Sequence, residues 1–321
     1  MSLKSISLQG CPQVTGQVVK TINSICGSLR YLNLSQCRHA QAAYLKEIFV
    51  HQRLCALNLS YIEGLGDEVF DFNMGGFAES SSNISTYSHQ LQKIHLGKSS
   101  ISDLSLIRMS TRFRDLVEVR FQWCSGVSDG GVVPLVQACP RLCVVDLKSS
   151  AITDVSLHAI ASYCKDLKVL DVSWCSALTN EGFAAFATDN SADDRVDVGG
   201  RARTISSGDD VLFDDDDDFL SLLFANAGSR SIENMDSSSP LSSLKKRSEV
   251  GPSLSSVAVS GVSSSRLQKL MVVWCPLLTE EFLLLLQALP ALRTIDAMGC
   301  AGISATAVDL FNSGGMAMVN V

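Results

Sequence analysis

The chain has 321 residues, of which 46% are hydrophobic and 18% are charged, and its formal net charge is −7. Its first residues lack the basic and apolar regions of a signal peptide, and its longest leucine run, Leu283 to Leu286, is too short to cross a bilayer. We therefore expect a protein of the cytoplasm, the nucleus or both, with no membrane contact.

An internal repeat runs along most of the chain. The pattern L-x-x-L-x-L-x-x-C occurs in nine copies, and six of the eight steps between copies are 25 or 26 residues long. The sixth position stays apolar even where leucine is replaced, as at Phe121 and Val172. The copies begin at Leu3, Leu29, Leu54, Leu91, Leu116, Leu142, Leu167, Leu267 and Leu292.

Each copy changes its hydrophobic period halfway. The first part alternates apolar and polar residues, as in 170–173, which predicts a short strand. The second part, as in 152–161, spaces its apolar residues at helical intervals, with Thr153 or Asp154 placed to cap the helix. One such unit cannot bury its own apolar face, so the copies are expected to stack around a shared core, with their strands in a parallel sheet.

Two further motifs support a family resemblance. Cys139-Pro140-Arg141-Leu142 and Cys164-Lys165-Asp166-Leu167 precede a strand, while Ile101-Ser102-Asp103 and Ile152-Thr153-Asp154 precede a helix. With the repeat, they resemble the cysteine-containing leucine-rich repeats of the F-box family and of the mitotic-exit antagonists that lack an F-box. The resemblance implies an α/β fold. It would be a leucine-rich-repeat solenoid, or horseshoe, of about nine repeats, with a concave parallel sheet and convex helices.

The repeats divide into two blocks. Residues 1–187 hold the first seven, with a loop insertion at about 71–89, and residues 266–312 hold the last two. The segment between the blocks, 188–265, is an acidic and serine-rich insertion, and 313–321 reads as a flexible tail. Both insertions fall between a helix and the next strand, so both should leave the solenoid at the same edge.

The larger insertion accounts for the net charge of the chain. It holds fourteen acidic and seven basic residues, against nineteen of each in the rest of the chain, and its composition predicts disorder. Apolar residues at 211–213 and 219–224 flank an aspartate run, which is consistent either with a segment that folds on a partner or with a stray cluster. Its candidate phosphorylation sites are Thr204, Ser206, Ser207 and Ser239.

Cysteine occupies the ninth position of most copies. The total of eleven cysteines is odd, and most share one phase of the repeat, so we expect reduced thiols that point inward and bond weakly to the backbone of the next turn. The chain has no C-x-x-C pair, and its histidines have no metal-ligand spacing, so we expect neither metal nor cofactor. The structural ladder comprises Cys11, Cys37, Cys124, Cys175, Cys275 and Cys300.

Side chains at the third, fifth and seventh strand positions should face the concave surface. At the fifth and seventh positions the residues are neutral to weakly acidic, without a run of lysine or arginine, which disfavours nucleic acid as a partner on this surface. A protein partner fits this mixture better. The candidate contact residues are Arg120, Asp146, Lys148, Asp171, Met271, Asp296 and Met298.

All three tryptophans, Trp123, Trp174 and Trp274, occupy the eighth position, where the strand turns toward the helix. If the large insertion loops out, two of them lie on adjacent coils. One interpretation is a hot spot for a protein partner, because large aromatic residues dominate protein interfaces. The other is packing between neighbouring repeats, since tryptophan before the cysteine is also a common variant of the family's repeat.

The resemblance implies a protein-interaction module, namely the substrate-recognition part of an SCF-type (cullin-RING) ubiquitin ligase. A Skp-type adaptor and a cullin would then join through an N-terminal F-box, but no L-P-x-E-type box precedes the first repeat here. The alternative is an F-box-free scaffold or regulator of a signalling or cell-cycle protein. An enzyme is not expected, since the chain lacks a phosphate-cradling glycine loop and any Ser-His-Asp or Cys-His setting.

Overall fold

The computed structural model describes residues 3–40, 42–51, 53–71, 90–187, 265–313 and 318–320. Nearly all of both predicted insertions lies outside these residues, including the four candidate phosphorylation sites, so those predictions remain predictions. The described residues belong to one compact unit, which joins Met1–Ala192 to Ala258–Val321.

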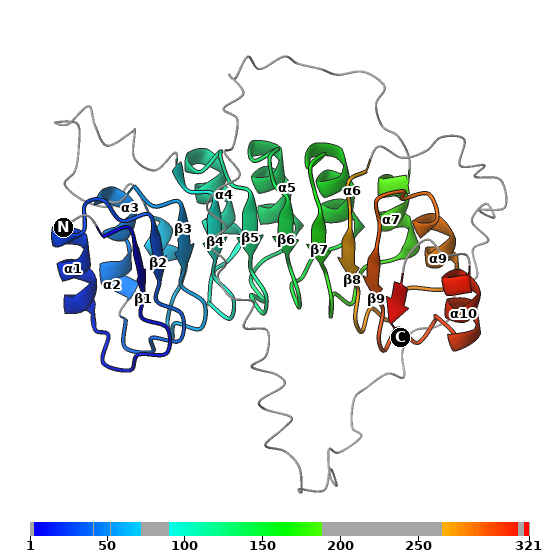
Figure 1. The fold of residues 1–321 in the computed structure, drawn as a ribbon, viewed down its shortest axis with the longest axis horizontal. Helices are drawn as coiled ribbons and strands as arrows, with labels where there is room; N and C mark the ends of the chain where they lie inside the picture. The colour runs from blue at the N-terminus through cyan, green and yellow to red at the C-terminus, as the bar shows by residue number, and fades with distance from the viewer. Residues whose placement is uncertain are drawn as a thin grey trace, which may run out of the picture. The chain divides into compact units, whose positions relative to one another are not determined.

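A single parallel sheet runs through this unit, with its strands in the order of the chain (Figure 1). Each strand is three residues long, because the turn toward the helix follows at once. The strands are β1 (Ser5–Ser7), β2 (Tyr31–Asn33), β3 (Ala56–Asn58), β4 (Lys93–His95), β5 (Glu118–Arg120), β6 (Val144–Asp146), β7 (Val169–Asp171), β8 (Lys269–Met271), β9 (Thr294–Asp296) and β10 (Met318–Asn320).

The tenth strand corrects one sequence prediction. Residues 313–321 read as a flexible tail, but Met318–Asn320 pairs in parallel with β9, Met318 opposite Thr294. The pairing satisfies backbone groups along one edge of β9, which would otherwise stay open. The repeat pattern did not reveal this strand, because no phased leucine or cysteine marks it.

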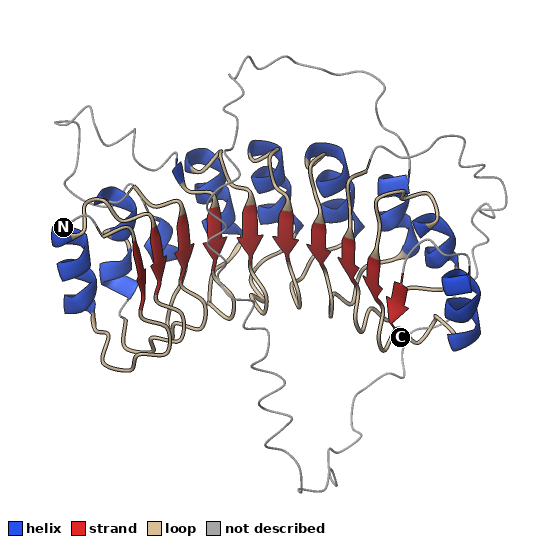
Figure 2. Cartoon of the chain, viewed as in Figure 1, coloured by secondary structure: helices blue, strands red, loops and turns tan. Residues whose placement is uncertain are grey.

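The helical segments lie together on one side of the sheet, as Figure 2 shows in blue behind the red strands. Among the described helices, none is both long and apolar enough to span a bilayer. The segments are α1 (Gly16–Ile25), α2 (Ala42–Leu45), α3 (Ile48–His51), the 3₁₀ turn η1 (Asp67–Phe70), α4 (Asp103–Arg112), α5 (Asp129–Ala138), α6 (Asp154–Tyr163), α7 (Asn180–Ala187), α9 (Glu281–Leu286) and α10 (Ala305–Ser313).

The core lies between the sheet and the helices and consists of the phased apolar residues. It is one continuous cluster from Val14 to Phe311, and central strand residues such as Leu32 and Leu170 are fully buried. The cluster continues across the large insertion, because β7 pairs directly with β8, with Leu170 opposite Leu270. The two blocks of repeats therefore form one solenoid.

The helix starts connect neighbouring coils. Thr153, not Asp154, caps α6: its side chain accepts a hydrogen bond from the Val155 amide. Asp154 instead accepts hydrogen bonds from the amide and hydroxyl of Thr179 on the next coil, at 2.9 and 2.6 Å. The I-T-D motif thus serves two functions, because one residue caps its own helix and the next holds the following coil.

Candidate functional site

The eighth position of the repeat has an unusual backbone. Trp123, Trp174 and Trp274 have φ angles of 63°, 64° and 55°, in the left-handed region. The other eighth-position residues have the same conformation: Gly10, Gln36, Tyr61, Lys98, Ser149 and Gly299. The conformation points each eighth-position amide along the sheet. The Trp174 amide, for example, donates to the Val273 carbonyl on the next coil at 2.7 Å.

The three tryptophans form a row, here called the tryptophan row. The Trp174 and Trp274 rings stack, with centroids 5.3 Å apart and planes at 22°. The Trp123 and Trp174 centroids are 6.3 Å apart although a whole coil separates them. That coil carries the small Ser149 at the eighth position, so the two rings approach each other across it. Neither the stacking nor the approach could be read from the repeat pattern.

The tryptophan row is open to solvent. The three residues, in chain order, are 38%, 46% and 55% exposed, and Met298 on the next coil is 50% exposed. At the far end, the Trp274 ring lies against Gly299: a Cβ at that glycine would come within 2.8 Å of the ring. The rings therefore pack on their neighbours along the row while their outer surfaces remain free for contact.

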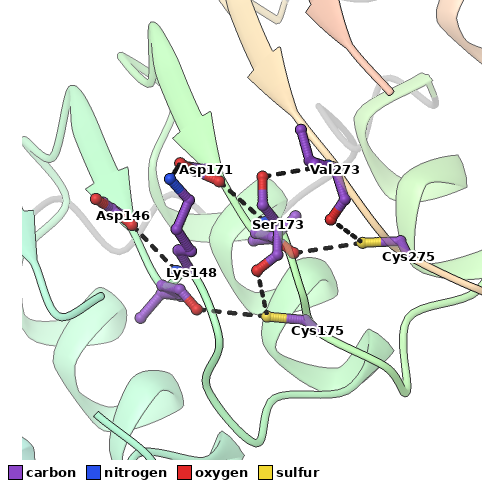
Figure 3. Close-up of polar contacts among 9 residues, drawn as sticks. Asp146, Lys148, Asp171, Ser173, Cys175, Val273 and Cys275 are labelled. Atoms are coloured by element: carbon purple, nitrogen blue, oxygen red, sulfur yellow. Dashed lines mark hydrogen bonds and ion pairs between the residues drawn. The ribbon is translucent and has the colours of Figure 1, made fainter. Parts of the chain in front are cut away.

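A second row, on the sheet, is formed by fifth-position carboxylates and amides. The Asp146 carboxylate accepts a hydrogen bond from the Lys148 amide at 3.0 Å, and Asp171 accepts one from the Ser173 amide at 2.9 Å (Figure 3). Asn33 makes the same bond with the Ser35 amide at 2.9 Å. These side chains end each strand by capturing the amide two residues on, which is an Asx-turn geometry.

Burial limits the contacts that this second row can make with a partner. Asp146 and Asp171 are only 6% and 4% exposed, so neither offers much direct contact to a partner, although both were sequence candidates. Burial and the neighbouring Asp171 charge raise the pKa of Asp146 well above that of an ordinary aspartate. The Lys148 ammonium lies 3.4 Å from Asp171 and opposes that effect. Asp146 and Asp171 therefore affect the charge of the sheet face more than they offer direct contacts to a partner.

A buried ionic cluster on β4 and β5 was missed by the sequence analysis. Glu118 lies 2.9 Å from His95, 2.8 Å from the Arg120 Nε and 3.3 Å from the Lys93 ammonium. Burial opposes ionisation of Glu118, but His95 and Arg120 outweigh it and hold the Glu118 pKa far below its usual value. Burial also lowers the pKa of His95, because desolvation outweighs Glu118. In the sequence, the only sign of this cluster is that its four residues occupy the third and fifth positions of two successive repeats, whose strands pair.

The ninth-position cysteines lie beneath these surface rows. Five of the six ladder thiols are buried, Cys11 being half-buried, and Cys175 donates to the Leu147 carbonyl at 3.4 Å. The acceptor belongs to the preceding coil, whereas the sequence analysis placed it on the next one. Burial raises the pKa of Cys275 to about 12, with smaller effects from Cys300 and Cys175, so this thiol stays protonated.

The described residues include no group of three or more His, Cys, Asp or Glu side chains arranged to hold a metal ion. The acidic side chains on the helix side are used in the links between coils, as Asp129 is with Thr153 and Ser156. The described surface thus presents a row of exposed aromatic rings beside a polar sheet face.

Comparison with known proteins identifies the repeat. Residues 163–187 match the family model described as Leucine Rich repeat. That coil is a leucine-rich repeat. Since the other described coils share its strand, turn and helix and its phased core, the fold is an α/β leucine-rich-repeat solenoid. Such solenoids offer extended surfaces to partners.

Three solved structures are similar to this chain, each at 12% sequence identity. The complex of Rad7 and Elc1 from yeast gives a TM-score of 0.47 over 95% of this chain and 72% of that chain. The TLR13–ssRNA13 complex gives 0.48 over 99% and 32%. The leucine-rich repeat-containing protein LegL7 from Legionella pneumophila gives 0.35 over 91% and 73%.

Proposed function

We propose that this chain recognises a protein partner through the tryptophan row and the adjoining sheet face. It would do so as the substrate-recognition part of an SCF-type ubiquitin ligase. The binding part of this proposal rests on the geometry of the row. The ligase part rests on the resemblance of the C-P-x-L and I-T-D motifs to the F-box leucine-rich-repeat family, with Skp-type adaptor and cullin as further partners.

One observation carries the binding proposal. The three tryptophans have a left-handed backbone, which costs a residue with a side chain roughly 1–2 kcal/mol, and Gln36, Tyr61, Lys98 and Ser149 share it at the eighth position of their own repeats. Glycine, which avoids this cost, occupies the same position at Gly10 and Gly299. What distinguishes the tryptophans from the other eighth-position residues is that three large aromatic rings lie in one exposed row, and such residues dominate binding energies at interfaces.

We propose that binding, not catalysis, is the activity. The described carboxylates with strongly shifted pKa values, Glu118 and Asp146, bond to neighbouring residues and lie on a sheet surface, and burial keeps thiols such as Cys275 protonated. All eleven cysteines are free, which fits the reducing cytoplasm or nucleus proposed for this chain.

The test is an affinity pull-down from cell extract, read by mass spectrometry, with the natural chain and a Trp174→Ala, Trp274→Ala variant. The control is Leu284→Ala, which removes another exposed apolar side chain, 63% exposed on α9. Thermal melts of all three chains check folding. We expect client proteins that the control retains and the tryptophan variant loses. An identical client set for all three folded chains would refute the proposed binding surface.

A second function shares the same surface. In an F-box-free scaffold or regulator, clients would again depend on the tryptophans, but cullin and a Skp-type adaptor would not accompany them. Their recovery with the natural chain and with the tryptophan variant would support the ligase proposal, because the adaptor would bind elsewhere.

A further inference from the structure

The strands begin at an edge that is rich in basic side chains. On β6 to β9 this edge carries six cations, here called the basic edge. None of them lies at the fifth or seventh position, where the sequence analysis looked for basic residues. Its members are Arg141, Lys165, Lys168, Arg266, Lys269 and Arg293.

The backbone brings these residues together. The Lys168 carbonyl accepts the amides of Gln268 and Lys269 at 2.8 and 2.9 Å, and the Gln268 carbonyl accepts the Arg293 amide at 2.8 Å. Lys168, Gln268 and Arg293 therefore occupy the same position on successive coils. Strands lie about 4.8 Å apart, so four coils place the array within about 15 Å. In Figure 1 the arrows of β6 to β9 start along this common edge.

The basic edge has a large excess of positive charge. Lys165, Lys168, Arg266, Lys269 and Arg293 are exposed, and Arg141 is half-exposed. Across described residues 139–145, 164–169, 265–269 and 290–294, the one acidic side chain is Asp166. With Asp115 of the preceding coil counted as well, six cations face two carboxylates, a net charge of +4.

The edge already binds carboxylates of its own. The Arg266 guanidinium donates to Asp166 at 2.6 Å, and Arg141 lies 3.6 Å from Asp115. The half-buried Cys143 thiol is influenced electrostatically by Lys168, Asp166, Arg141 and Arg266, so these groups share one neighbourhood. Guanidinium groups match carboxylates in geometry as well as charge. Among the described residues, four cations of the array have no carboxylate partner, although Lys165 donates to the Ala161 carbonyl: Lys165, Lys168, Lys269 and Arg293.

We propose that the basic edge binds an acidic stretch of a partner polypeptide, and so selects clients with a run of aspartate or glutamate. The proposal rests on the proposed protein-recognition function and deepens it. The tryptophan row follows the strands and the basic edge precedes them, so the sheet face lies between an aromatic contact and a charged one. Complementary charge of this kind contributes specificity and a faster association.

The test measures binding of a fluorescein-labelled peptide of ten aspartates to the full chain by anisotropy, at low and at physiological salt. The variant is Lys168→Glu, Lys269→Glu. Its matched control is Arg38→Glu, Lys46→Glu, which makes the same change of charge at exposed positions elsewhere. All titrations are repeated with Asp214 to Asp218 changed to asparagine, which removes competing negative charges from the chain itself.

We expect the basic-edge variant to raise the Kd about tenfold and the control to raise it less than about twofold. Equal effects of the two variants, or no peptide binding in either background, would overturn the proposal. So would an unlabelled ten-nucleotide oligothymidine that displaces the peptide at lower concentration than the unlabelled peptide does. Clients that still depend on the tryptophans would then leave the proposed function standing. Peptide binding that depends on the basic edge, without tryptophan-dependent clients, would instead support the basic-edge proposal and refute the proposed binding surface.

Discussion

The Cys275 thiol donates a hydrogen bond of 3.4 Å to the Val172 carbonyl, across 103 residues of sequence. The repeat therefore places the cysteine of the eighth repeat against the seventh coil as if the intervening segment were absent. The same bond, from a ninth-position thiol to the sixth-position carbonyl of the coil before, recurs at Cys37, Cys124, Cys175 and Cys300.

Replacing Cys275 by alanine should therefore weaken the solenoid at the junction of its two blocks. The thiol is fully buried, so its removal leaves a small cavity and takes one of two hydrogen bonds from the Val172 carbonyl, which keeps the bond from the Cys175 amide; the cost is about 1 to 2 kcal/mol in the free energy of unfolding. Urea denaturation followed by circular dichroism measures this cost. Cys55→Ala is the control: this half-buried thiol should contribute less than about 0.5 kcal/mol. Equal costs for the two variants would contradict a structural function of the ladder.

The sequence predicted the solenoid because its determinants repeat. Leucine phase, cysteine phase and the I-T-D helix start recur at fixed spacing, and each needs only one neighbouring coil to act. β10 was missed because Met318–Asn320 has no such phase and joins the sheet by pairing with β9. Period and phase thus predict coils that resemble one another, but not a strand that merely completes an edge.

The site was less predictable, because it depends on pairs of side chains on different coils. The repeat phase located the tryptophans but showed neither their left-handed backbone nor the approach of Trp123 to Trp174 across Ser149. Alternation correctly placed Asp146 on the sheet face, yet it could not reveal that closely spaced neighbours bury the carboxylate. Burial on a parallel sheet depends on the residues on both adjacent strands, not only on the direction of one side chain.

Changing Glu118 to glutamine should destabilise the protein at neutral pH. The carboxylate is nearly buried and neutralises Lys93 and Arg120, and removing one partner of a buried ion pair costs about 3 kcal/mol. Because the folded-state pKa of Glu118 is depressed, its contribution is present above an unfolded pKa of 4.5 and is lost as the pH falls.

The difference in unfolding free energy between the natural chain and Glu118→Gln should thus shrink from pH 7 toward pH 3. Chemical denaturation across that range measures it. Glu281→Gln, at an exposed position on α9, serves as the control and should show almost no difference at any pH. A Glu118→Gln effect that does not change with pH would show that the ionised carboxylate contributes little.

Asp146 should show the opposite pH dependence. Its pKa is raised by burial and by Asp171, so its contribution to stability is present below the unfolded pKa of 3.8 and is lost as the pH rises through the folded pKa. Asparagine fits the site, because Asn33 makes the same backbone bond at the equivalent position. We expect Asp146→Asn to raise the melting temperature by about 2 °C or more at pH 8 and to lose this advantage by pH 4. A variant that melts below the natural chain at pH 8 would refute the like-charge repulsion.

At the junction across the large insertion, Asn180 holds the place that an aspartate has in the four preceding links between coils. Where Asp154 accepts both the amide and the hydroxyl of Thr179, Asn180 accepts the Thr279 amide at 3.2 Å and donates its own amide to the Thr279 hydroxyl. Asn180→Asp should restore two charge-assisted bonds and raise stability by about 0.5 kcal/mol, a modest gain because the contact is solvent-exposed. Thermal denaturation of Asn180→Asp, Thr279→Ala and the double variant forms a cycle that isolates the pair. The gain should fall by about half when Thr279 is alanine, because the hydroxyl is lost while the backbone amide of residue 279 remains; an undiminished gain would arise from the charge at the start of α7 instead.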